Sequence, residues 1–298
     1  GLTTPYTVAV DINGNEQNGT GILALSTFGP ITAGAGYFNN TNFENLTEIN
    51  LTRGIGSGSG TTNLSLDAGR DMYVATVQGD LDFVKLEAWY AGMQNTFGSY
   101  TLAATSNLDL AENAKIGLEA RYVNLQLNSN AIQATNAGAL GALTSDDNSM
   151  FRLAVDGKFS IVNARLAYTM TDKDGGLTAL DQDAKNTSLG WFISSNGIAD
   201  ADYFQAALGA DILDNLNFTA HYGNLKADEV DAGKVTMNTL GFAGAELKQQ
   251  EIYGQLTYKM SKNLTTYLRY GTYDQKEVSS GDKEQDQTRG RLQVAYTF

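Results

Sequence analysis

The stretch from Glu251 to Met260 reads EIYGQLTYKM, and its character changes at every second residue. Positions 252, 254, 256, 258 and 260 are apolar or neutral, whereas positions 251, 253, 255, 257 and 259 are mostly polar. Successive side chains of a β-strand point to opposite faces. The stretch therefore predicts a strand with one apolar face and one polar face.

The same alternation recurs along the whole chain, which predicts an all-β antiparallel fold. In the next segment Leu264, Leu268 and Tyr270 alternate with Thr265, Tyr267 and Arg269. We expect about fourteen strands. They fall at residues 4–12, 19–28, 30–38, 71–79, 82–92, 97–108, 113–125, 149–159, 161–172, 202–213, 215–225, 249–260, 263–274 and 287–298.

The connections between these strands alternate in length. Short turns are predicted at residues 29–30, 79–82, 110–112, 160, 214–215 and 261–263, and longer loops at 39–70, 126–148, 173–201, 226–248 and 275–286. Transmembrane β-barrels have short turns on one side of the membrane and long loops on the other. A soluble β-sandwich or β-helix also alternates, but it is not expected to sort its loops by side. The pattern favours one transmembrane β-barrel domain over residues 1–298.

Composition is consistent with this interpretation and excludes other classes. No apolar run approaches the roughly 20 residues of a transmembrane helix, whereas a barrel strand needs only about 9–11 residues with alternate apolar positions. The net charge of −13 disfavours nucleic acid as a partner. The chain has no cysteine and one histidine, His221, so a zinc site is not supported. The G-x-S-x-G and G-x-x-x-x-G-K-[ST] strings are absent as well, and we predict that the protein is not an enzyme.

Charged residues on the inward face predict a water-filled pore. A barrel of about fourteen strands is wider than one whose side chains fill the interior, and unpaired charges there require water. The predicted pore-lining residues are Lys85, Glu87, Lys115, Glu119, Arg121, Arg152, Asp156, Arg165, Asp211, Glu251, Arg269, Arg289 and Arg291. Two loops are candidates for folding into the pore, namely 39–70, with its glycines and apolar residues, and 173–201, with Leu189 and Trp191 to Ile193.

Aromatic residues and both ends of the chain point to a family. Tyrosines recur near strand ends, as in the interfacial girdles of barrels, and the last strand alternates as Leu292, Val294, Tyr296 and Phe298, which resembles the assembly signal of outer-membrane barrels. The start GLT with VAVD at 8–11, and the end RLQVAYTF, resemble the major outer-membrane porins of campylobacter-type bacteria. About four of the strands expected in that family are missing before Gly1, which favours an N-terminally incomplete chain over a shorter relative.

The resemblance implies a cation-preferring general porin of about eighteen strands that assembles as a homotrimer. It also implies calcium in the channel, with Asp11 and Asp181 as ligands. From the residues and the resemblance together we predict a Gram-negative outer-membrane porin, in contact with membrane lipid and lipopolysaccharide, that passes ions and small hydrophilic solutes. The alternatives are a substrate-specific channel and a surface adhesin with a plugged lumen.

Overall fold

The computed structural model describes residues 3–10, 16–42, 69–128, 146–230, 245–278, 281 and 283–297. Thirteen strands form one sheet in which each strand pairs antiparallel with the next along the chain. They are β1 Gly19–Phe28, β2 Ile31–Thr41, β3 Met72–Leu81, β4 Val84–Met93, β5 Phe97–Ala111, β6 Ala114–Leu127, β7 Asp147–Phe159, β8 Val162–Thr171, β9 Ala201–Leu213, β10 Leu216–Val230, β11 Ala245–Lys259, β12 Leu264–Glu277 and β13 Lys283–Tyr296. None of the described helices is long and apolar enough to cross a membrane.

The all-β antiparallel prediction is confirmed, and thirteen of the expected strands are present. The strand expected at 4–12 is not formed within the described residues. Residues 3–10 instead lie against residues 180 and 186, with the backbone N–H of Leu180 donating to the Tyr6 carbonyl and that of Asn186 to the Pro5 carbonyl. The alternation of residues 4–10 therefore reflects a packed segment inside the curve of the sheet, where Tyr6 is fully buried.

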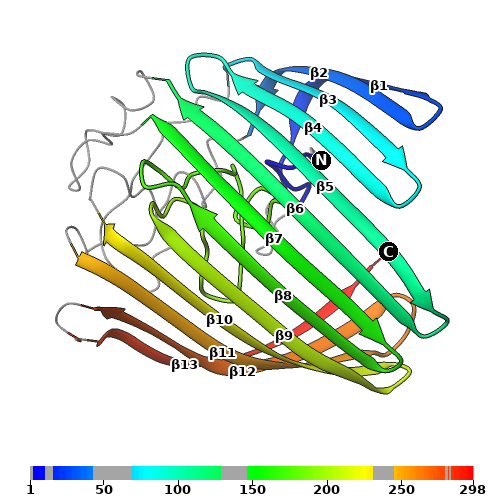
Figure 1. Ribbon diagram of the computed structural model, residues 1–298, viewed down its shortest axis with the longest axis vertical. Coiled ribbons are helices and arrows are strands. Elements are labelled where there is room, and N and C mark those ends of the chain that lie inside the picture. Colours follow the sequence, from blue (N-terminus) through cyan, green and yellow to red (C-terminus); the bar gives the residue numbers. More distant parts are fainter. Residues whose placement is uncertain are drawn as a thin grey trace.

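Tight turns connect the strands at one end of the sheet. Gly29, Asp82 and Ser160 begin three of these turns with φ near +55°, at 58°, 54° and 54° respectively. Positive φ at this position matches the right-handed twist of the paired strands, and glycine or a short polar residue tolerates it best. Figure 1 shows these turns at one end, and the loop between β8 and β9 at the opposite end, within the curve of the sheet.

The buried apolar core lies between the inner face of the sheet and the segments that it encloses. One cluster joins Tyr6, Leu177 and Leu180 to inward residues of β2 to β7. A second cluster joins Phe192, Ile193 and Ile198 to inward residues of β9 to β12. Residues 172–200 and Tyr6 thus supply the apolar surface that covers the loop end of the inner wall.

Candidate functional site: the inner face of the sheet

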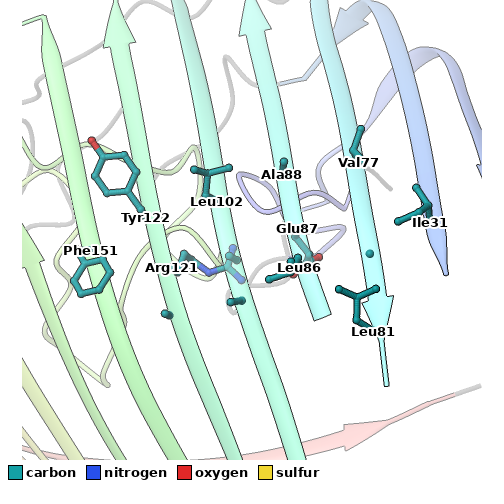
Figure 2. Close-up of a pocket in the computed structure, with 14 residues that line it drawn as sticks. Ile31, Val77, Leu81, Leu86, Glu87, Ala88, Leu102, Arg121, Tyr122 and Phe151 are labelled. Atoms are coloured by element: carbon teal, nitrogen blue, oxygen red, sulfur yellow. The ribbon is translucent and has the colours of Figure 1, made fainter. Parts of the chain in front are cut away.

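The two faces of the sheet differ in chemistry, as alternation requires. The outer face exposes large apolar side chains, among them Leu208 at 61%, Tyr270 at 64% and Leu292 at 69%. Figure 2 shows a groove on this face, with a volume of about 550 Å³, lined mainly by aliphatic and aromatic residues of β2 to β7. Exposed apolar surface of this extent, carried by a sheet with a polar opposite face, is typical of contact with lipid.

The inner face carries all the described charges that the sequence assigned to it. Lys85, Lys115, Asp156 and Arg289 are exposed, and Glu87, Glu119, Arg165, Asp211, Arg269 and Arg291 are half-buried. Arg121, Arg152 and Glu251 are buried, with relative exposures of 2%, 7% and 2%. These last three do not line open space, because residues 185–193, here called the inner segment, cover them.

Arg121 and Arg152 lie directly opposite each other on β6 and β7. Like charges in this position repel, so they need compensation. Glu119 provides part of it, since its carboxylate lies 2.7 Å from Arg152 Nε and 3.5 Å from Arg121 Nη2. The inner segment provides the rest, because Arg152 donates to the carbonyls of Thr187 at 2.6 Å and Lys185 at 2.8 Å.

The inner segment follows the wall from β5 to β13. At its start Asn186 donates to Thr101 of β5 and accepts from Arg121 of β6. Further along, its contacts are Ser188 with Thr169 of β8 at 2.6 Å, and the Leu189 carbonyl with Gln205 of β9 at 3.1 Å. The Phe192 ring then packs on Tyr273 of β12 at 5.3 Å and under Arg289 of β13 at 5.1 Å. The segment is therefore a lining of the wall, held residue by residue.

Glu251 of β11 holds the far part of the inner segment. Its carboxylate accepts hydrogen bonds from the backbone N–H groups of Trp191 at 3.0 Å, Phe192 at 2.7 Å and Ile193 at 3.4 Å. Gly190 lies against the same carboxylate, and a Cβ at Gly190 would come within 1.7 Å of Glu251 Oε1. A side chain at position 190 would therefore require the carboxylate or the inner segment to move.

A second cross-strand arginine pair, Arg269 and Arg291, lies on β12 and β13. Unlike the first pair, it has no ion pair with any described carboxylate. Arg269 donates to Gln255 Oε1 from Nε at 2.8 Å and from Nη2 at 2.6 Å, and its guanidinium lies 5.3, 5.1 and 5.2 Å from the ring centroids of Trp191, Tyr253 and Tyr267. Aromatic faces attract a guanidinium but do not neutralise it.

At the turn end, an open cavity of about 900 Å³ adjoins the inner face. Its lining includes Asp156 and Arg165, which pair at 2.6 Å, and Lys158, which pairs with Asp211 at 2.5 Å. His221 also lines it, with its ring stacked on Tyr253 at 4.4 Å. The cavity wall is therefore polar and internally paired, whereas Arg269 and Arg291 form no ion pair with a carboxylate of the described residues.

Sequence reasoning missed the polar residues that join the inner segment to the wall. Asn186 and Thr101 do not stand out in the sequence, because each is an ordinary polar residue in its local stretch. Tyr6 was missed as well, since the sequence placed it in a wall strand. Burial raises the pKa of the Tyr6 phenol, which accepts a hydrogen bond from Thr101.

The calcium prediction rested on Asp11 and Asp181, and Asp11 lies outside the described residues. Asp181 is fully buried, and its oxygens accept hydrogen bonds from the side-chain amide of Gln17 and the backbone N–H of Asp183. Calcium needs about six to eight oxygen ligands. Among the described residues no group of three or more acidic or histidine side chains suited to a metal occurs, and calcium binding through Asp11 and Asp181 stays a prediction.

Comparison with solved structures supports the fold. The chain is similar to the Acinetobacter baumannii channel OccAB3, with 15% identity and a TM-score of 0.71 over 100% of this chain and 72% of that one. It is similar to Pseudomonas aeruginosa OccD3 (OpdP), with 14% identity and a TM-score of 0.71 over 99% of this chain and 72% of that one. It is also similar to OccK2 (OpdF) of the same bacterium, which was solved in complex with glucuronate. The sequence identity is 12% and the TM-score is 0.70, over 99% of this chain and 75% of that one.

These neighbours are OprD/Occ β-barrels of the Gram-negative outer membrane, which agrees with the predicted fold class and location. They are not the campylobacter-type porins that the chain ends resemble, so the resemblance to porins holds at the level of the fold. No protein-family model matches the chain. No curated protein matches it by sequence either.

Proposed function

We propose that this protein is a passive outer-membrane channel, not an enzyme, and that it favours small hydrophilic solutes carrying a carboxylate. The observation that carries the proposal is the Arg269–Arg291 pair on the inner wall, which has no carboxylate partner among the described residues. The strand register places these two arginines opposite each other, and a guanidinium offers a planar set of N–H donors that matches a carboxylate. Glucuronate, a sugar acid, is the solute in the OccK2 complex, which has the same fold.

The inner segment supports selection rather than free diffusion. It occupies the loop end of the single barrel domain that we propose. A solute that moves past it along β12 and β13 would meet the part of the wall that includes Arg269 and Arg289. A solute that passes there meets positive charge and aromatic rings together. Such a lining favours a sugar acid over a neutral sugar of the same size.

A cation-preferring general porin is the second candidate, because the whole chain carries a net charge of −13. Acidic residues outside the inner wall would then dominate the field at the channel mouth. The two candidates predict opposite signs of ion selectivity. A plugged adhesin, in contrast, predicts no current at all.

Single-channel recording in planar bilayers, under a potassium chloride gradient, tests the proposal. We expect stable steps and a reversal potential on the anion-selective side, together with faster entry of glucuronate than of a neutral hexose into vesicles. A cation-selective potential with equal entry of both sugars would establish the general porin instead. Calcium binding through Asp11 and Asp181 and assembly as a homotrimer stay predictions. Equilibrium dialysis with calcium and light scattering in detergent test them separately.

A further inference from the structure

Two charged wall residues each make three hydrogen bonds to the inner segment: Arg152 to its first part and Glu251 to its far part. Glu251 is 2% exposed, and its two oxygens accept all three consecutive backbone N–H groups from Trp191 to Ile193. Hydrogen bonds to a charged acceptor are stronger than neutral ones. Removing the carboxylate would leave three backbone donors without their partner, two of them in buried hydrogen bonds, which is unfavourable.

Trp191 connects the backbone held by Glu251 to Arg269 of the arginine pair. Its ring lies 5.4 Å from that of Tyr253, edge to face, and 5.3 Å from the guanidinium carbon of Arg269. Tyr253 and Tyr267 approach the same guanidinium, but both belong to wall strands. Trp191 is the contact to Arg269 that depends on where the inner segment lies.

Glu251 and Arg269 form no ion pair, although their opposite charges attract at longer range. The contacts that connect Glu251 to the Arg269 guanidinium run through the backbone and ring of Trp191. We propose that Glu251 is a positioning residue for solute selection: by holding the backbone at Trp191, it fixes the guanidinium of Arg269 against the wall, beside Arg291. This inference rests on the proposed function and adds to it a residue that never touches the solute.

The direction in which Glu251→Gln changes the anion preference distinguishes a positioning role of Glu251 from a purely electrostatic one. If Glu251 acted only as a negative charge near the channel, Glu251→Gln would raise anion preference. If it positions Arg269, Glu251→Gln lowers anion preference, because the glutamine –NH2 faces backbone donors and the segment moves away. Glu87→Gln is the matched control, since Glu87 lies on the same inner face and pairs with Lys85 at 3.7 Å. We expect that control to raise anion preference.

Trp191→Ala is the second variant, and it changes no charge. It keeps the backbone donors to Glu251 but removes the ring above Arg269, so it should shift the reversal potential in the same direction as Glu251→Gln. If Glu251→Gln behaves like Glu87→Gln and Trp191→Ala leaves the potential unchanged, the positioning role is overturned.

A fluorescence measurement keeps the test independent of transport. The chain has two tryptophans, so Trp89→Phe leaves Trp191 as the reporter. We expect Glu251→Gln to shift the Trp191 emission to the red and to increase its quenching by iodide. An unchanged emission would contradict the anchoring. Absence of current in the unmodified protein would overturn the proposed function instead, whatever the emission shows.

Discussion

Ala207 and Leu208 are adjacent on β9 but belong to opposite environments. Leu208 is 61% exposed on the outer face, whereas Ala207 lines the 900 Å³ cavity of the inner face. The boundary between lipid and water therefore runs through a single strand. Its position can be tested by placing the same charge on either side of it.

We predict that Leu208→Arg blocks insertion and Ala207→Arg does not. Arginine on the lipid face of a barrel costs about 2–4 kcal/mol near the bilayer midplane, whereas an inward substitution mainly changes selectivity. The measurement is folding yield into lipid vesicles, read from heat-modifiable mobility on gels. Equal yields for the two variants would contradict the assignment of faces.

Replacing Arg152 tests the buried anchor on β7. Arg152→Met removes the Glu119 pair and the hydrogen bonds to the Lys185 and Thr187 carbonyls. Breaking a buried pair typically costs about 3–5 kcal/mol. Glu119 would keep only its longer contact with Arg121, and the carbonyls of Lys185 and Thr187 would lose their donor. We expect a loss of that order in the free energy of unfolding, measured by urea titration in vesicles.

Arg165→Met is the matched control for that variant. Its pair with Asp156 is 2.6 Å long but about half-exposed, with side-chain exposures of 43% and 52%. Exposed pairs contribute about 0–1 kcal/mol. A loss as large as that of Arg152→Met would show that burial does not govern the difference.

The strand pattern was predictable because period-two alternation is a local property of the sequence. The alternation of residues 252 to 258 is enough to orient β11, and the inward charges follow from the same register. The inner segment was less predictable. Trp191 and Phe192 stand out as apolar residues in a loop, but nothing local shows that Glu251 binds their backbone, since that contact spans 59 residues at Phe192. The misassigned strand at 4–12 has the same cause, because Tyr6 alternates like a wall residue and yet packs on residues distant in sequence.

Arg291 provides the direct test of the charge that carries the proposed function. We expect Arg291→Gln to shift the reversal potential toward cations and to slow glucuronate entry more than hexose entry, because one of two adjacent guanidinium groups is lost. Lys262→Gln, in the exposed turn between β11 and β12, removes the same charge away from the inner wall. A similar shift in both variants would point to overall charge instead of the pair.

Gly190 gives a test of the inner segment that changes no charge. Adding a methyl group there places a carbon 1.7 Å from Glu251 Oε1 and 2.7 Å from the Tyr203 hydroxyl, so either the carboxylate or the segment has to move. We expect Gly190→Ala to increase current noise and shift selectivity toward cations, since the anchors at Trp191 to Ile193 are lost while the wall stays intact. Gly290→Ala on β13 is the control, because its nearest contact would be an ordinary 3.6 Å to Tyr270. Quiet, unshifted currents from Gly190→Ala would mean that the inner segment does not control the channel.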